Sequence, residues 1–190
     1  MLFRSGIFKT VVVEPNTPVA KPDTDPVKEG YTFDAWLLGG ISYPFSWPVT
    51  QNITLEPNFI INKYTVRFLD SNASLISSVV VNHGSKVSRP TDPTKDGHTF
   101  KGWNLGELPY NFNLEVFESF DLVAQWSANV YRVRFFYRQT LLKSEDVIYG
   151  GDATPPVVPI NEGYTFTGWD KSYTNITENV DINAKEAIST

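Results

Sequence analysis

The sequence predicts a mainly β protein, built as a tandem array of three small repeats that forms an elongated rod. Three observations support this. The phrase GYTFDAW at residues 30–36 returns as GHTFKGW at 97–103 and as GYTFTGW at 163–169. The apolar runs are rich in Val, Ile, Thr, Phe and Tyr, and aromatic residues make up 14% of the chain, which favours packed strands. The 13 prolines leave little room for long helices.

The tryptophans that end the phrase lie 67 and 66 residues apart, an interval that suits a string of small domains. We place repeat 1 at residues 1–60, repeat 2 at 61–128 and repeat 3 at 129–190. Only four residues lie between Phe59, at the end of one repeat, and Tyr64, at the start of the next, and again between Trp126 and Tyr131. Joints this short hold neighbouring repeats close together, which predicts the rod.

Each complete repeat has the same predicted order of elements. It opens with an alternating strand, KYTVRFL at 63–69 or VYRVRFFY at 130–137, whose period of two marks a half-buried strand. A polar turn, a second strand and a Pro-rich crossover follow. The phrase then forms a strand, and a loop leads to the closing strand.

Alternation in the closing strands predicts which side chains are buried. We expect Leu55, Leu122 and Ile182 to face the core. Their preceding neighbours, which point to the opposite face, are Thr54, Asp121 and Asp181.

The phrase itself predicts a turn and a packing anchor. The first glycine suits a turn that needs positive φ, and the small residue before the tryptophan predicts a bulge that turns the indole towards the core. A tryptophan at one fixed register favours packing over the alternative, a row of glycan-stacking platforms. The predicted structural anchors are Gly30, Phe33, Trp36, Gly97, Phe100, Trp103, Gly163, Phe166 and Trp169.

The segment ISYPFSWPV at 41–49 has two interpretations, a packed loop or an exposed binding loop. In register, Tyr43 corresponds to Tyr110, and the persistence of apolar character favours packing. Trp47 corresponds to Leu114 and is the aromatic residue that we retain as a candidate ligand contact.

Composition excludes several classes of function. The net charge of −5 without a basic run argues against nucleic acid as a partner. The absence of cysteine excludes disulfides, thiolate metal sites and a cysteine nucleophile. No stretch approaches the roughly 18 apolar residues of a membrane span, so membrane insertion is not expected. Two histidines that do not recur in repeat 3, and no known catalytic motif, predict no metal, no cofactor, no catalytic residue and no enzymatic activity.

The pattern of alternating strand, valine run, glycine, Pro-rich segment, (K/N)-(E/D)-G-(Y/H)-T-F-x-(G/A)-W, loop and closing strand resembles the Listeria–Bacteroides repeat family, also called internalin-type B repeats. The resemblance covers nearly the whole chain. Its departures are Ala35 in place of the usual glycine and a shorter loop in repeat 3. It implies small β-grasp-like modules, which occur in tandem on secreted and surface-anchored bacterial proteins, commonly between a ligand-binding head and a cell-wall anchor.

Repeat 1 lacks the start of its opening strand in this register, because Met1 corresponds to Phe68 and Phe135. We therefore expect an excised piece of a longer protein or a degenerate end-cap. The loss predicts an open sheet edge, through which copies of the chain would self-associate. It also predicts that repeat 1 is the least stable of the three.

The expected function is a non-enzymatic segment of a bacterial cell-surface or secreted protein, acting as a stalk or spacer with an adhesive surface as a second role. The alternative is a dedicated adhesion module that binds a host protein or a glycan. A spacer predicts close contact between repeats, whereas an adhesion module predicts an exposed patch that is not repeated. Neighbouring domains of the same parent protein are the other expected partners.

Overall fold

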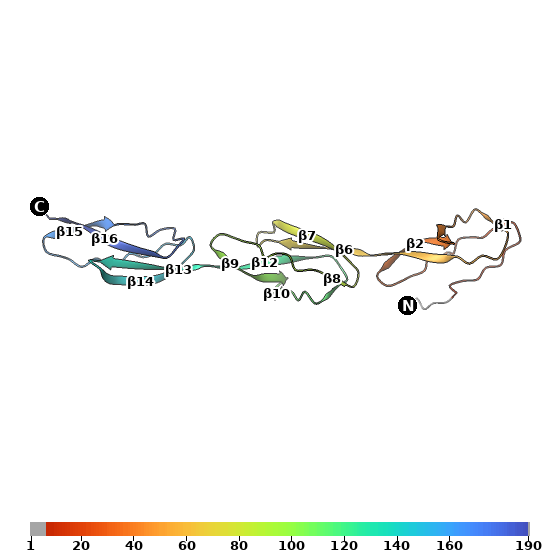
Figure 1. Ribbon diagram of the computed structural model, residues 1–190, viewed down its shortest axis with the longest axis horizontal. Helices are drawn as coiled ribbons and strands as arrows, with labels where there is room; N and C mark the ends of the chain where they lie inside the picture. The colour runs from red at the N-terminus through yellow and green to blue at the C-terminus, as the bar shows by residue number, and fades with distance from the viewer. Residues whose placement is uncertain (1–6, 190) are drawn as a thin grey trace. The chain divides into compact units, whose positions relative to one another are not determined.

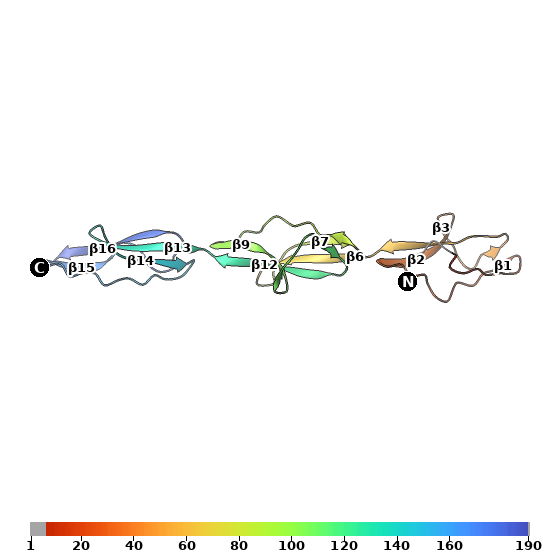
Figure 2. The same ribbon diagram turned by 90° about the horizontal axis from the view of Figure 1, so that it is seen from below.

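The computed structural model describes residues 7–189. These residues form strands, turns and extended segments without any helix, so the mainly β fold is confirmed (Figure 1 and Figure 2). Accordingly, the described part of the chain has no helix that could cross a membrane.

The chain divides into two compact units, each of which is described by itself. The first unit comprises Met1–Phe68, Ser77–Arg89 and Asn111–Leu122. The second unit comprises Leu69–Ile76, Pro90–Tyr110 and Val123–Thr190. The joint between repeats 1 and 2 therefore lies within the first unit, and the joint between repeats 2 and 3 lies within the second.

Repeat 1 contains a three-stranded sheet in the order β3-β2-β5. Its strands are β2 (Tyr31–Leu38), β3 (Ile41–Ser42) and β5 (Glu56–Ile61), and a separate antiparallel pair is formed by β1 (Thr17–Pro18) and β4 (Pro48–Val49). β2 pairs antiparallel with both of its neighbours.

The expectation that Leu55 is buried was wrong. Leu55 precedes β5 and is only half-buried, while Thr54 beside it is exposed. Among the described strands, β5 has β2 as its one neighbour, so no opening strand of repeat 1 covers this leucine. The predicted remnant of that strand, at residues 1–3, lies outside the described residues.

Repeat 2 contains a five-stranded sheet in the order β10-β9-β12-β6-β7. The strands are β6 (Lys63–Leu69), β7 (Leu75–Asn82), β9 (His98–Leu105), β10 (Leu108–Pro109) and β12 (Phe120–Ala128), and a separate pair is formed by β8 (Ser85–Lys86) and β11 (Glu115–Val116). β6 coincides with the predicted opening strand. Leu122 is fully buried as expected, and Asp121 lies on the outer face, where it pairs with Arg67.

Repeat 3 contains a four-stranded sheet in the order β14-β13-β16-β15. The strands are β13 (Val130–Tyr137), β14 (Thr140–Ile148), β15 (Tyr164–Trp169) and β16 (Val180–Ile188). β13 forms a hairpin with β14 and pairs parallel with the closing strand β16, which pairs antiparallel with β15. This is the predicted order of hairpin, crossover, phrase strand and closing strand.

The core of repeat 3 lies on one face of this sheet and under its loops. Its buried members are Val133, Phe135, Val147, Ala153, Ile176 and Ile182. The expectation for Ile182 is confirmed, and Asp181 beside it pairs with Arg134 on the outer face. Each fully buried side chain of this kind contributes roughly 1.5–3 kcal/mol, which is a large share of the stability of so small a domain.

Candidate functional site: the joints between repeats

Each copy of the phrase begins with a tight turn. In repeat 1 the amide of Tyr31 donates to the carbonyl of Lys28 at 3.1 Å, and Gly30 has φ +76°. A negative φ at Glu29 followed by a positive φ at the glycine is the pattern of a type II turn. The other two copies repeat the bond at 3.0 Å, with φ values of +66° at Gly97 and +80° at Gly163.

A β-bulge follows the turn in every copy, as predicted. The register of β2 against β5 shifts between Phe33 and Ala35, and β15 against β16 shifts between Phe166 and Gly168. In repeat 2 the register of β12 against β9 shifts between Gln125, which pairs with Gly102, and Trp126, which pairs with Phe100. The extra residue brings the phenylalanine and tryptophan of each copy into contact, with ring centroids 5.4–5.6 Å apart.

An asparagine in the first joint connects three segments. The amide of Asn62 donates to the carbonyl of Gly30 at 2.9 Å, and its own carbonyl accepts from the amide of His83 at 2.8 Å. Its side-chain Oδ1 accepts from the Thr32 hydroxyl at 2.7 Å. One linker residue thus ties the phrase of repeat 1 to the hairpin of repeat 2.

The second joint repeats this arrangement atom for atom. The amide of Asn129 donates to the carbonyl of Gly97 at 2.8 Å, and its carbonyl accepts from the amide of Tyr149 at 2.8 Å. The Thr99 hydroxyl donates to Asn129 Oδ1 at 2.7 Å. The same joint is therefore built twice from different surrounding sequence.

In both joints an aromatic ring of the later repeat lies directly on the turn glycine of the earlier one. A Cβ added to Gly30 would lie 2.1 Å from His83 Cδ2, and a Cβ added to Gly97 would lie 2.0 Å from Tyr149 Cγ. Only glycine permits so close an approach. We call the turn glycine, together with the linker residue whose amide donates to it, the ring seat.

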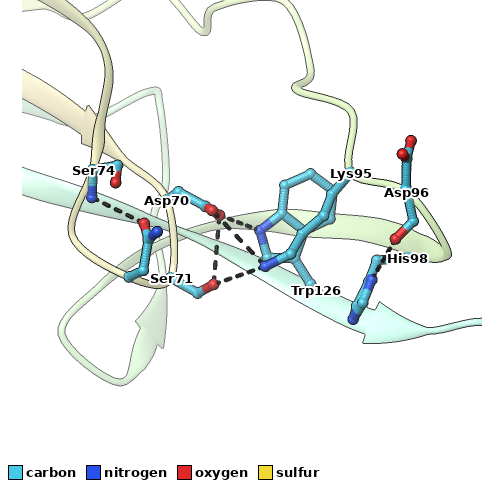
Figure 3. Close-up of polar contacts among 8 residues, drawn as sticks. Asp70, Ser71, Ser74, Lys95, Asp96, His98 and Trp126 are labelled. Atoms are coloured by element: carbon cyan, nitrogen blue, oxygen red, sulfur yellow. Dashed lines mark hydrogen bonds and ion pairs between the residues drawn. The ribbon is translucent and has the colours of Figure 1, made fainter. Parts of the chain in front are cut away.

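Further aromatic residues surround each seated ring. His83 lies between Tyr64, whose hydroxyl is 3.3 Å from His83 Nδ1, and Phe117, whose ring centroid is 5.0 Å away. Tyr149 is flanked by Tyr131 at 6.4 Å and by His98 at 6.1 Å. The side chain of His98 is itself held, because its Nδ1 donates to the carbonyl of Asp96 at 2.8 Å (Figure 3).

A polar contact near the second joint fixes the end of the closing strand in repeat 2. Trp126 Nε1 donates to the carboxylate of Asp70 at 2.7 Å, and Lys95 lies 3.8 Å from the same carboxylate (Figure 3). Lys95 also donates to Ser71 Oγ at 3.2 Å and lies over the Trp126 ring. The backbone amide of Ser71, followed by Trp126 and Lys95, lowers the pKa of Asp70 below its ordinary value against the opposing effect of burial.

Repeat 3 makes the corresponding contact with donor and acceptor exchanged. There the Tyr137 hydroxyl donates to Glu186 Oε2 at 2.8 Å, and Arg138 Nε donates to Glu186 Oε1 at 2.8 Å. The hairpin turn supplies the acceptor in repeat 2 and the donors in repeat 3. Both arrangements join the opening hairpin to the closing strand.

The predicted anchors differ in burial between repeats. Trp36 and Trp103 are 6% and 3% exposed, and Trp169 packs partly buried against the core of repeat 3. Phe33 and Phe100 are half-buried.

Phe166, in contrast, is 44% exposed. The cross-strand partner explains the difference. Phe33 and Phe100 face the aromatic rings of Phe59 and Trp126, with centroids 5.9 and 5.3 Å apart, whereas Phe166 faces Glu186.

The loop at 41–49 is packed at one end and open at the other. Tyr43 is 6% exposed, which confirms packing there, whereas Trp47 is 54% exposed. Their rings make an edge contact at 6.2 Å. No group of three or more His, Cys, Asp or Glu side chains that could hold a metal occurs among residues 7–189.

Sequence reasoning missed the residues that build the joints. The predicted four-residue joints are shorter in the structure, where Asn62 alone separates β5 from β6 and Asn129 alone separates β12 from β13. Each seated ring directly precedes the glycine that follows the second strand of the hairpin. The asparagine recurs as the same residue in both joints, whereas the seated ring is a histidine in one and a tyrosine in the other. The ring requirement could not be read from the sequence, because the turn alone already explains the phrase glycine.

Comparison with known proteins assigns the chain to a family. The Listeria-Bacteroides repeat domain matches at residues 5–56, 64–125 and 131–189. Internalin H of Listeria monocytogenes is 34% identical over 73% of this chain and 25% of its own length. A protein of Evansella cellulosilytica named as a membrane protein is 34% identical over 85% of this chain and 24% of its own length. The chain thus spans about a quarter of the length of these curated relatives.

A solved structure of Streptococcal High Identity Repeats in Tandem domains 3-4, from a cell surface protein, is 15% identical with a TM-score of 0.30. The matched region covers 67% of this chain and 98% of the streptococcal chain. The three family matches span nearly the whole sequence, and they coincide with the three copies of the turn, bulge and tryptophan. The chain belongs to the Listeria-Bacteroides repeat domain family.

Proposed function

We propose that this chain is a non-enzymatic spacer segment of a bacterial cell-surface or secreted protein, whose repeats are held in fixed contact by their ring seats. The observation that carries the proposal is the repetition of one joint, with the same three hydrogen bonds made by Asn62 and by Asn129. Membership of a repeat family and the names of the relatives support the surface location.

The joint has features that favour stiffness. The linker asparagine makes two hydrogen bonds to the phrase of the earlier repeat and one to the hairpin of the later repeat, so rotation between the two repeats would break one of these two sets. Each such bond contributes about 0.5–1.5 kcal/mol net. The seated ring adds buried contact that would also be lost on rotation. A spacer requires this resistance to bending, whereas a flexible linker would be rich in unbonded Gly and Ser.

Backbone relaxation measured by NMR tests the proposal. Repeats 2 and 3 should share one rotational correlation time in the unmodified chain, and they should separate in the variant Asn129→Gly. Solution scattering should give a radius of gyration well above the roughly 16 Å of a compact globule of this length. Independent tumbling of the repeats in the unmodified chain would contradict the spacer role.

A second candidate function, adhesion, is favoured by one observation. Trp47 and Ile41, 54% and 70% exposed, belong to the same loop of repeat 1. An exposed tryptophan with an apolar neighbour is suited to stacking on a sugar ring or to anchoring in a protein pocket. Binding to a panel of bacterial and host glycans, compared between the unmodified chain and Trp47→Ser, tests this role. Binding that is equal in the two proteins would remove Trp47 from consideration.

A further inference from the structure

We propose that the turn of repeat 3 around Gly163 is a ring seat, built to receive the aromatic ring of a further repeat of this family. This inference rests on the geometry of the two joints and stands whether or not the array serves as a spacer. Its partner is defined by chemistry: a His or Tyr ring that directly precedes the glycine after the second strand of the opening hairpin, joined through a short linker.

The turn at Gly163 has the backbone of the two occupied seats. Its φ of +80° compares with +76° at Gly30 and +66° at Gly97. The amide of Ser189 donates to the carbonyl of Gly163 at 2.9 Å, in the place of the bond that Asn62 or Asn129 makes. The hydroxyl of Ser189 lies 2.8 Å from that of Thr165, as the asparagine Oδ1 lies beside Thr32 or Thr99.

What differs is the space above the glycine. A Cβ added to Gly163 would meet no atom of residues 7–189 within 4 Å, whereas at the other two seats it would lie 2.0–2.1 Å from the nearest ring atom. The surroundings are correspondingly open, since Tyr164 is 42% exposed and Ile188 is 75% exposed. The corresponding residues of the first joint, Tyr31 and Ile61, are half-buried.

The apolar rim and the bonded serine argue for a repeat of the same kind over other occupants. The seat offers a glycine face with an aromatic and an aliphatic side chain beside it, which matches the flat ring that the other seats hold. Arg138 lies over the Tyr164 ring at 4.6 Å and is engaged by Glu186, so its charge is already satisfied within repeat 3. Glu162 of the turn corresponds to Glu29 and Asp96, the acidic residues that precede the glycine in the two occupied seats. Continuity with the two existing joints makes the hairpin of a further repeat the occupant that fits.

The test uses the Hα resonances of the phrase glycines, which report a ring seated on the glycine. In the unmodified chain, Gly30 and Gly97 should show upfield ring-current shifts, and Gly163 should not. A second copy of residues 129–190 is then fused directly after Ile188. The Gly163 Hα should now shift upfield by an amount comparable to that of Gly97.

The matched control is the same fusion with Tyr149→Leu in the added copy alone, which should fold but leave Gly163 unshifted. If Gly163 does not move in the first fusion while the added repeat gives the dispersed spectrum of a folded domain, the inference is wrong. In the unfused chain, an upfield shift of the Gly163 Hα resonance that depends on protein concentration would show that a second copy of the chain occupies the site. This outcome also overturns the inference. Loss of common tumbling between repeats 2 and 3 would contradict the spacer function without affecting this result.

Discussion

Replacing Gly97 by alanine tests the central feature of the joint. The substitution adds one methyl group at a position where φ is +66° and where the Tyr149 ring already lies 2.0 Å from the new atom. The methyl group therefore has two effects: it strains the turn, and it displaces the ring of the next repeat. These two effects can be separated at Gly163, which has the same turn but no ring of the described residues lying on it.

The two costs can be estimated from the structure. Left-handed backbone costs an alanine about 1–2 kcal/mol relative to glycine, and this applies equally to Gly97→Ala and Gly163→Ala. Forcing a methyl group into an occupied contact adds typically 1–3 kcal/mol. The ring cannot give way cheaply, since the atoms of Tyr149 nearest to the new methyl group are its Cγ, Cδ1 and Cδ2, close to the backbone and not at a flexible tip. We therefore expect Gly97→Ala to destabilise by about 1–3 kcal/mol more than Gly163→Ala.

Native-state hydrogen exchange is the suitable assay, because an array of repeats need not unfold in a single transition. Protection is read on the amides of β9 and β12 for Gly97→Ala, and on those of β15 and β16 for Gly163→Ala. The double variant Gly97→Ala with Tyr149→Ala completes a thermodynamic cycle. With the ring removed, the alanine at position 97 should cost only the strain of the turn.

Two results would refute this reasoning. Equal destabilisation by the two single substitutions would mean that the ring contributes nothing to the requirement for glycine. Additive effects of Gly97→Ala and Tyr149→Ala in the cycle would mean that the two residues are not coupled.

Three further predictions concern the repeats themselves. Leu122→Ala should cost about 2–5 kcal/mol, since the side chain is fully buried, and Leu55→Ala should cost clearly less, as read by exchange in each repeat; equal costs would contradict the assigned burial. The hydrogen bonds from Arg67 lower the pKa of Asp121 below its ordinary 3.8, so the pair stabilises the fold above that pH and the contribution is lost on further acidification. Asp121→Asn should therefore reduce the loss of stability of repeat 2 below about pH 4, and an unchanged acid profile would exclude the pair as its source. Finally, amides of residues 10–57 should exchange faster than their counterparts in repeats 2 and 3 in a verified monomer; equal protection would disprove the lower stability expected of repeat 1.

Much of each repeat could be predicted because its causes are local. The positive φ at Gly30 follows from the turn that the phrase must make, and the bulge before Trp36 follows from the need to return the indole to the face of Phe33. Alternation placed Leu122 and Ile182 correctly for the same reason, since period two needs only the neighbouring residues. It failed at Leu55, where burial depends on a second strand lying alongside.

Contacts across the sheet were harder to foresee. Trp126 and Glu186 occupy the same register position, yet one donates to Asp70 and the other accepts from Tyr137. Neither residue alone indicates its partner, and the exchange of donor and acceptor removes any shared residue type that a comparison of repeats could detect. Phe166 is exposed because its cross-strand partner is Glu186, where repeat 2 has Trp126, and a carboxylate does not cover a neighbouring ring as an indole does.

The joints were missed for a different physical reason, which is that one residue satisfies two independent requirements. The turn alone accounts for glycine at all three phrase positions, so the glycine gives no separate indication that an aromatic ring of the next repeat lies on it. The ring requirement acts at Gly30 and Gly97, and it concerns an atom that glycine lacks. A requirement that a Cβ be absent produces no sequence pattern of its own. It can be recognised only from the aromatic residue that occupies the position, which is a histidine in one joint and a tyrosine in the other. Asn62 and Asn129 were the detectable part, because a side chain that bonds a threonine, together with a backbone that bonds both neighbours, recurs as the same letter at the same place in two joints.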